Sequence, residues 1–159
     1  MMQLRPYQPR TDAPLLAALY RESVLAIAPQ RYSPQQVQAW AAYGQNDADL
    51  ARRLESGITL VGVIDDQPVA FGQLWPMDYL AFLYCASDHC RRGYASRLYD
   101  VLESYAISAG SSFITTHASE FSRPVFERKG FRLVEIEHVI RSDVRFDRYV
   151  MRKDLTTQA

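Results

Sequence analysis

The segment Asp88–Asp100, DHCRRGYASRLYD, carries more information about the architecture of this chain than any other part of the sequence. Two arginines run directly into Gly93, and a helical pattern begins at that glycine. The first turn of a helix has unpaired backbone N–H groups and partial positive charge, so several donors can bind a phosphate there at once. Gly93 lets the backbone approach such an anion, and the small side chain of Ala95 leaves space beside it. Arg91 and Arg92 add positive charge. The segment therefore predicts an anion site between a strand and a helix.

Helical and strand patterns alternate on both sides of this segment. The helix that follows it extends from about Gly93 to Ala109, and the strand that precedes it covers Asp78–Cys85. The other expected elements, in chain order, are a strand at 3–7, a helix capped by Thr11 or Asp12, a helix that Ser33 and Gln36 begin with a capping box, a helix at 47–56, a hairpin of 58–64 and 69–75, a strand at 111–117, a helix at 122–129, and a hairpin of 131–140 and 143–152. This order predicts an α+β fold with a mixed sheet.

Length and composition favour one compact domain that spans residues 1–159. The 18 Lys and Arg side chains balance the 18 Asp and Glu side chains, so no overall field recruits nucleic acid or an acidic membrane, and the expected partner is a small molecule. There is no apolar run of about 20 residues and no apolar secretory core at the start, so we expect a cytoplasmic protein. Cys85 and Cys90 are the only cysteines, so we expect free thiols and no metal site.

Two motifs resemble those of the GNAT superfamily of N-acetyltransferases. The sequence has neither the GK[ST] of a P-loop nor the GxGxxG of a Rossmann turn, but Cys90–Ala95, CRRGYA, resembles the GNAT pyrophosphate signature (Q/R)xxGx(G/A). Phe126–Phe131, FERKGF, resembles the YExxGF segment of the same family, and the order of the expected elements matches over nearly the whole chain. The resemblance implies a mixed sheet that splays between its fourth and fifth strands, with helices on both faces.

The resemblance also implies that acetyl-coenzyme A is bound in the splayed gap. Backbone groups of Leu83, Tyr84 and Cys85 would pair with the pantetheine arm, and Ser119 and Phe126 would lie beside it. The residues expected at the pyrophosphate are Cys90, Arg91, Arg92, Gly93, Tyr94, Ala95 and Ser96. The acceptor would lie across the gap, in a pocket shaped by Ile27, Tyr32 and Trp40.

The sequence departs from the family pattern at two positions. Cys90 replaces the usual glutamine or arginine, which is tolerable where that position acts through its backbone. Phe126 replaces the tyrosine that protonates the departing thiolate in many members. A thiol pKa of about 8.5 makes coenzyme A a fair leaving group without an acid, and Tyr84 is one candidate for a substitute acid.

An amine acceptor must lose a proton before it attacks, so a base or a water chain is needed. The candidates are His117 near the end of the fifth strand, Asp78 before the fourth strand, and Glu120. A local hydrogen-bonding role for His117 and a turn role for Asp78 stay open. We read His138 as structural or pocket-lining, because it shares a strand face with apolar residues.

Three functions remain open from the sequence. The leading one is an N-acetyltransferase that transfers the acetyl group directly to a primary amine of a small molecule or peptide. The second is a catalytically silent acyl-CoA-binding sensor, and the third is an interaction domain on the same fold. An acetyl-cysteine intermediate on Cys85 is a less favoured mechanism. Trp40, Tyr43 and Trp75 are read as core residues or as contacts of a homodimer.

Overall fold

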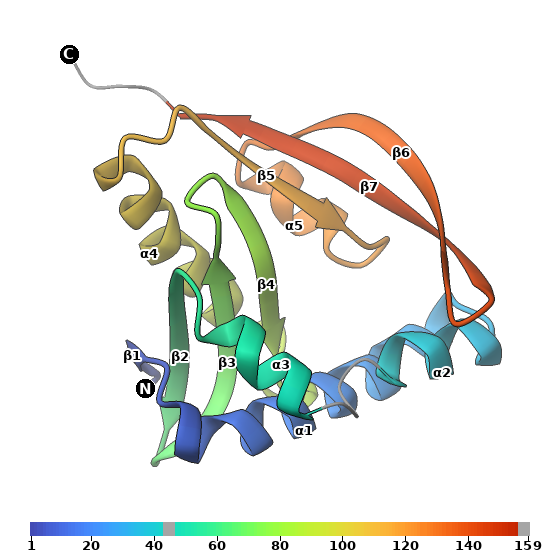
Figure 1. Cartoon of the computed structure of the whole chain (residues 1–159), viewed down its shortest axis with the longest axis horizontal. Coiled ribbons are helices and arrows are strands. Elements are labelled where there is room, and N and C mark those ends of the chain that lie inside the picture. Colours follow the sequence, from blue (N-terminus) through green and yellow to red (C-terminus); the bar gives the residue numbers. More distant parts are fainter. Residues whose placement is uncertain (43–46, 156–159) are drawn as a thin grey trace.

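A computed structural model describes residues 1–42 and 47–155, and Figure 1 shows their arrangement. The described elements are β1 (Gln3–Pro6), α1 (Pro9–Ile27), η1 (Ala28–Gln30), α2 (Pro34–Ala42), α3 (Asp47–Leu54), β2 (Ile58–Ile64), β3 (Gln67–Leu74), β4 (Tyr79–Cys85), η3 (Ser87–His89), α4 (Tyr94–Ser108), β5 (Phe113–Ala118), α5 (Arg123–Arg128), β6 (Arg132–Arg141) and β7 (Val144–Asp154). The α+β prediction is confirmed, and the predicted element order holds throughout. Tyr43 lies outside the described residues.

One mixed sheet connects the described strands in the order β1-β2-β3-β4-β5-β7-β6. Every neighbouring pair is antiparallel except β4 and β5, which are parallel. That parallel ladder contains only the pairs Tyr79 with Thr115 and Leu80 with Thr116. Beyond Leu80 the two strands diverge, as Figure 1 shows, so the predicted splay is confirmed.

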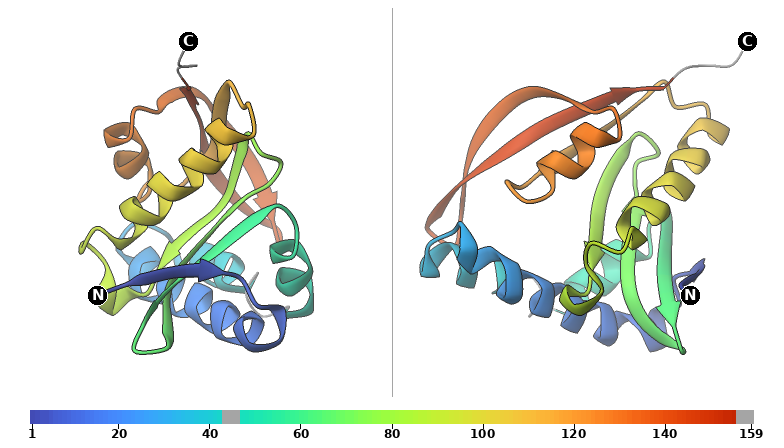
Figure 2. Two further views of the ribbon diagram at one scale, coloured as in Figure 1. Left: turned by 90° about the vertical axis from the view of Figure 1, so that its left-hand side faces the viewer. Right: turned by 180° about the vertical axis from the view of Figure 1, so that it is seen from behind.

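Helices cover both faces of the sheet, and each face has its own apolar core. On one face, Leu98, Tyr99 and Leu102 of α4 pack with buried residues of the strands and with Phe126 of α5. On the other face, α1, α2 and α3 pack against Val61 and Phe71. Figure 2 shows these layers from two further directions. The sheet therefore holds α1 and α4 in fixed positions on either side of the splay.

The helix starts agree with the capping signals at α2 but not at α1. At α2, the backbone N–H of Gln36 donates to Ser33 Oγ at 3.1 Å, and the backbone N–H of Ser33 donates to Gln36 Oε1 at 2.9 Å, which confirms the capping box. The prediction that Thr11 or Asp12 caps α1 is wrong, because the helix begins at Pro9. Proline at the first helical position needs no N–H partner, which explains the earlier start. Asp12 is buried instead in an ion pair with Arg5, at 2.7 Å.

The pocket-lining reading of His138 is wrong, whereas the structural reading agrees with its contact to Asp147 on the neighbouring strand. The side chain of His138 is 56% exposed, and Val134, Ile136 and Ile140 on the same face of β6 are exposed as well. The residues between them, Glu137 and Val139, are half-buried, so the opposite face of the strand points inward. Trp75 is half-exposed rather than part of either core.

Within residues 1–42 and 47–155, no helix is long and apolar enough to cross a membrane. In the same residues, no group of three or more His, Cys, Asp or Glu side chains is placed to hold a metal ion.

Candidate active site

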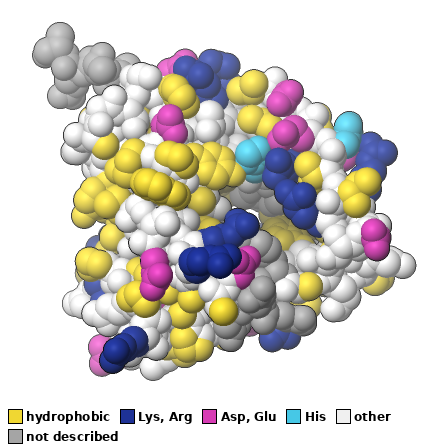
Figure 3. Space-filling view, viewed as in Figure 1, with side chains coloured by type: hydrophobic (Ala, Val, Ile, Leu, Met, Phe, Trp, Pro, Cys, Tyr) yellow, Lys and Arg dark blue, Asp and Glu magenta, His cyan; other side chains and the backbone are white. Residues whose placement is uncertain are grey.

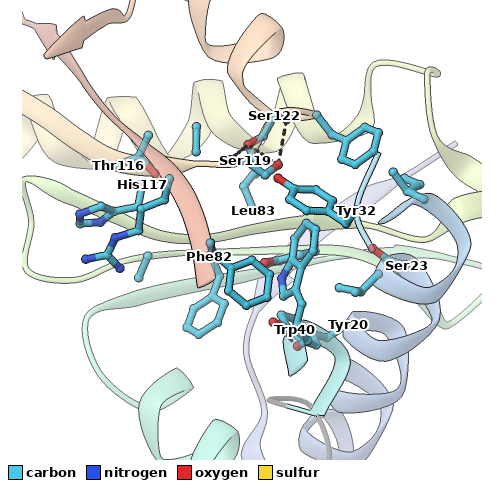
Figure 4. Close-up of a pocket in the computed structure, with 18 of the residues that line it drawn as sticks. Tyr20, Ser23, Tyr32, Trp40, Phe82, Leu83, Thr116, His117, Ser119 and Ser122 are labelled. Atoms are coloured by element: carbon cyan, nitrogen blue, oxygen red, sulfur yellow. Dashed lines mark hydrogen bonds between the residues drawn. The ribbon is translucent and has the colours of Figure 1, made fainter. Parts of the chain in front are cut away.

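A cavity of about 600 Å³ occupies the splay between β4 and β5. Residues of α1, α2, β4, β5 and the β6–β7 hairpin line it, together with Cys90 and Ala95 near the start of α4. Of the residues expected from the sequence, those that line the cavity are Ile27, Tyr32, Trp40, Leu83, Tyr84, Cys85, Cys90, Ala95, His117, Ser119 and Phe126. The structure therefore brings these residues to one space (Figure 4), whereas the expected Arg91, Arg92, Gly93, Tyr94 and Ser96 do not line it.

The edge of β4 forms one wall of this cavity. Leu83 and Cys85 pair with Gly72 and Ala70 of β3, while the ladder to β5 has already ended at Leu80. A strand edge at which the next strand diverges can receive an extended ligand through main-chain hydrogen bonds. The edge therefore suits a linear chain with amide groups.

The start of α4 supplies an anion-binding geometry beside this edge. Gly93 has a φ of +82°, and Arg91 two residues before it has a φ of +64°. The first turn of α4 carries no acidic residue and Gly93 makes no side-chain cap. A Cβ at Gly93 would meet no atom within 4 Å, so the space above the turn is open. Backbone N–H groups in such a turn, with the exposed Arg91 and Arg92 beside them, suit a phosphate.

Cys85 and Cys90 lie where the edge of β4 meets this loop. The Sγ of Cys85 donates to the carbonyl of His89 at 3.5 Å, and the Sγ of Cys90 donates to the carbonyl of Ala86 at 3.3 Å. Burial, together with the neighbouring Cys90, raises the pKa of Cys85 to about 12. Cys85 is therefore a neutral thiol near pH 7, and both cysteines are free, as expected.

His117 is held from both sides at one end of the cavity. Its Nδ1 lies 2.5 Å from the hydroxyl oxygen of Tyr79, and its Nε2 lies 3.0 Å from Glu137 Oε1. The same carboxylate oxygen accepts a hydrogen bond from Nε of Arg148 at 3.2 Å. Burial lowers the pKa of His117 below its ordinary value, Arg148 lowers it further, and Glu137 acts in the opposite direction.

This arrangement determines the protons on the ring. A carboxylate can only accept, so Nε2 of His117 donates to Glu137. In neutral histidine the other nitrogen is then an acceptor, so Nδ1 accepts a hydrogen bond from the hydroxyl group of Tyr79. Both nitrogens are engaged in this state.

The two other expected bases do not line the cavity. Asp78 precedes β4 at the closed end of the splay, where its carbonyl accepts from the backbone N–H of Thr115 at 2.9 Å. Glu120 is exposed, and its backbone N–H donates to the hydroxyl of Tyr32 at 3.3 Å. The carboxylates of Asp78 and Glu120 therefore stay apart from the space that His117 faces.

The acceptor side of the cavity is aromatic. The ring of Tyr32 packs against Trp40, Phe121 and Phe146, with centroid separations of 5.5, 5.9 and 6.3 Å. Figure 4 shows Tyr32, Trp40 and Phe82 facing one space, with Ser119 and Ser122 across it and His117 at its end. This wall joins the segment before α2, α2 itself, β4 and the hairpin around one space.

Comparison with known proteins agrees with this geometry. A family model described as "Acetyltransferase (GNAT) domain" matches residues 28–153. The uncharacterized N-acetyltransferase YafP of Escherichia coli (strain K12) is 33% identical over 151 residues, which are 95% of each chain. This chain belongs to the GNAT acetyltransferase family.

Solved GNAT structures share its fold. A GCN5-related N-acetyltransferase of Rhodopseudomonas palustris superposes with a TM-score of 0.92 at 30% identity, over 96% of this chain and 95% of that one. The PaiA N-acetyltransferase of Thermoplasma acidophilum, in complex with coenzyme A, gives a TM-score of 0.79 at 14% identity, over 98% of this chain and 99% of that one.

The residues at two family positions have local partners in this GNAT chain. Ser119, which the resemblance places beside the cofactor, has its Oγ 3.2 Å from Oγ of Ser122 (Figure 4). Phe126 stands at the position of the family's tyrosine and is 3% exposed. Its ring packs 5.2 Å from Phe131 and 6.4 Å from Tyr99, so it is shared between the α4-side core and the cavity wall.

Sequence reasoning missed the contribution of the hairpin to the site. Phe146 and Arg148 of β7 line the cavity, and Arg141 and Val139 of β6 do so as well. Phe146 and Arg148 are two residues apart on β7 and therefore share one strand face, but the apolar Ile136 and Ile140 favour the other face of β6. The sequence pattern therefore predicted that the apolar face of β6 points inward, although that face is exposed.

Proposed function

We propose that this chain is an acetyl-CoA-dependent N-acetyltransferase that transfers the acetyl group directly to a primary amine of a small molecule or peptide. The observation that carries the proposal is the open edge of β4 at Leu83–Cys85, directly followed by the phosphate-binding geometry at Gly93. Coenzyme A has an amide-containing arm joined to a pyrophosphate, so these two adjacent features match its two parts. Family membership supports the same reading.

The residues present fit this co-substrate. The backbone of Leu83 and Cys85 would hold the pantetheine arm, and the N–H groups of Gly93–Ser96 would hold the pyrophosphate, with Arg91 and Arg92 adding charge. When bound, acetyl-CoA supplies an acyl group activated as a thioester. Apolar side chains form most of the wall of the cavity in which the thioester would lie.

In the transfer itself, the amine nitrogen bonds to the acetyl carbon while the carbon–sulfur bond breaks and its electron pair leaves on sulfur. The amine must lose one proton, and we assign its acceptance to His117. Its lowered pKa keeps it neutral near pH 7, and its Nδ1 is the accepting nitrogen. The hydroxyl of Tyr79 donates to that nitrogen and does not line the cavity, so it orients the ring and must turn its hydrogen away when Nδ1 takes the proton.

Cys85 argues against a covalent acetyl-enzyme. A nucleophilic cysteine acts as a thiolate, and a pKa of about 12 leaves this group protonated near neutral pH. Its thiol also donates to a backbone carbonyl of its own loop. A ternary complex with direct transfer therefore fits the site better than a relay through Cys85.

The test is a thermal-shift titration with acetyl-CoA, followed by a screen that detects thiol release in the presence of amines. We expect stabilisation that rises with acetyl-CoA concentration and thiol release that requires an amine. Stabilisation without thiol release on a broad panel would favour the silent sensor, for which the buried Phe126 is the supporting observation. Failure of acetyl-CoA to stabilise the protein would favour an interaction domain.

A further inference from the structure

The acceptor half of the cavity offers two kinds of recognition, and the first is an aromatic wall. Tyr32, Trp40, Phe121 and Phe146 enclose one region, and Phe82 and Tyr20 extend it along β4 and α1. Rings that meet at edge-to-face and tilted angles favour a further aromatic ring between them. Residues of α1 that line this region, Tyr20, Ser23, Val24 and Ile27, are all uncharged.

The second kind of recognition is positive charge, which comes from the hairpin alone. Among the described residues, the charged side chains that line the cavity are Arg141, Asp147 and Arg148. Asp147 already has His138 at 2.5 Å and Arg145 at 3.8 Å as partners. Arginine therefore supplies the charge that remains available to a ligand at this end of the cavity.

Arg148 is suited to reach such a ligand. Its side chain is 32% exposed, and its ion pair with Glu137 is made through Nε. A guanidinium held through Nε still presents its two terminal nitrogens, which match a carboxylate in a fork geometry. Figure 3 shows Lys and Arg side chains and a histidine gathered beside a hollow on this face. The same positive field adds to the lowering of the pKa of His117, to which both Arg148 and Arg141 contribute after burial.

We propose that the acceptor is a primary amine that carries both an aromatic ring and a carboxylate, as an aromatic α-amino acid does. The ring would lie against Tyr32, Trp40 and Phe146, and the carboxylate would pair with Arg148. This inference rests on the proposed acetyltransferase function and names its substrate class. Polyamines and lysine side chains of basic peptides are disfavoured, because a second positive charge would face Arg141 and Arg148.

The experiment is a matched panel in which N-acetylation is measured by mass spectrometry and kcat/KM is compared. Phenylalanine and tryptophan carry ring and carboxylate, phenethylamine and tryptamine carry only the ring, alanine carries only the carboxylate, and spermidine carries neither. We expect phenylalanine to exceed both phenethylamine and alanine by at least about tenfold, since a charge-assisted pair contributes about 1.4 kcal/mol or more.

Two variants locate the charge. Arg148→Gln should bring phenylalanine and phenethylamine to similar kcat/KM, whereas Arg145→Gln, on the exposed face of the same strand, should keep the parent's preference. The parent's panel alone decides the question if Arg148→Gln does not fold. Equal rates for phenylalanine and phenethylamine in the parent, or spermidine as the best acceptor, would overturn this inference while leaving the acetyltransferase proposal intact. Binding of acetyl-CoA with no acetylation of any amine would overturn both.

Discussion

His117 shows how burial and partners set the chemistry of one side chain. Its ring is 28% exposed and lies between Tyr79 and Glu137, with the charge of Arg148 close behind the carboxylate. Burial disfavours the imidazolium, and the arginine adds to that effect, so the pKa of His117 lies below its ordinary value. A neutral ring can accept a proton near pH 7, which a protonated one cannot.

This lowered pKa predicts how stability depends on pH. An unfolded chain binds a proton to His117 near pH 6.5, and the folded chain binds it only at lower pH, so the folded state holds fewer protons in between. The contribution of neutral His117 to stability is therefore fully present above about pH 6.5 and is lost as the pH falls through the folded-state pKa. We expect the free energy of unfolding of the parent to fall more than that of His117→Gln between pH 7.5 and pH 5, measured by urea unfolding.

The comparison contains its own control. The loss of unfolding free energy that His117→Gln causes at pH 7.5 is independent of this titration. Only the change in unfolding free energy between the two pH values is therefore compared. Equal losses in the two proteins between pH 7.5 and pH 5 would show that the pKa of His117 is not lowered by folding.

Phe126 allows a second test at the residue scale, because it replaces the family's tyrosine. If thiolate departs without an acid, Phe126→Tyr should change kcat/KM by less than about tenfold, since a new hydroxyl helps only in the correct geometry. Phe131→Tyr is the matched control, because Phe131 is equally buried in the same ring cluster but does not line the cavity. A parent that binds acetyl-CoA without turnover, rescued by Phe126→Tyr and not by Phe131→Tyr, would contradict the enzyme proposal.

At the scale of elements, α4 contributes its first turn to the proposed function and its apolar face to the core. Leu98 and Leu102 are fully buried on the sheet, which fixes the direction of the helix axis. That direction places the N-terminal turn, led by Gly93, next to the end of β4. The turn proposed to bind the pyrophosphate is thus positioned by the same apolar stripe that made the helix predictable from the sequence.

Gly93→Glu should weaken acetyl-CoA binding while the fold is kept, because a carboxylate above this turn repels a pyrophosphate. Gly110→Glu is a close control. Gly110 also has a positive φ, +85°, and open space around its Cβ position, but it follows the other end of α4. Calorimetry should show a loss of affinity of at least about tenfold for Gly93→Glu and little change for Gly110→Glu. Similar affinities for the two variants would contradict the phosphate-site assignment.

The difference between α4 and β6 explains how much the sequence could predict. Along α4 the apolar Leu98, Leu102 and Ala106 recur at helical spacing and are buried, so pattern and burial agree there, although Tyr105 and Ile107 are exposed. On β6 the apolar Ile136 and Ile140 are exposed, while Glu137 and Arg141 are on the face toward the cavity. Alternation shows that a strand has two faces, but only tertiary context decides which of them is inside. The position of the loop and helix that carry the local motif was therefore predictable, and the hairpin's share of the cavity wall was not.

At the scale of the whole molecule, the acceptor cavity is closed by contact between segments that are far apart in the sequence. The tip of the β6–β7 hairpin reaches across the splay to α2, as Figure 1 shows. There, Nε2 of Gln36 donates to the carbonyl of Arg145 at 2.9 Å. The same side chain uses its Oε1 in the capping box with Ser33. One glutamine side chain thus joins the start of α2 to the hairpin through two hydrogen bonds, and mutations can remove these bonds separately.

Gln36→Glu separates these two contacts, because a carboxylate still accepts from Ser33 but cannot donate to the carbonyl of Arg145. Gln36→Ala removes both contacts. We expect Gln36→Glu to speed hydrogen exchange at residues 141–146 by about fivefold, the effect of losing a net hydrogen bond of about 1 kcal/mol, with no change at the start of α2. Gln36→Ala should speed exchange at both places. If the hairpin exchanges at the parent's rate in both variants, then apolar contact of Tyr32 with Phe146 holds the cavity closed, and Tyr32→Ala should open it instead.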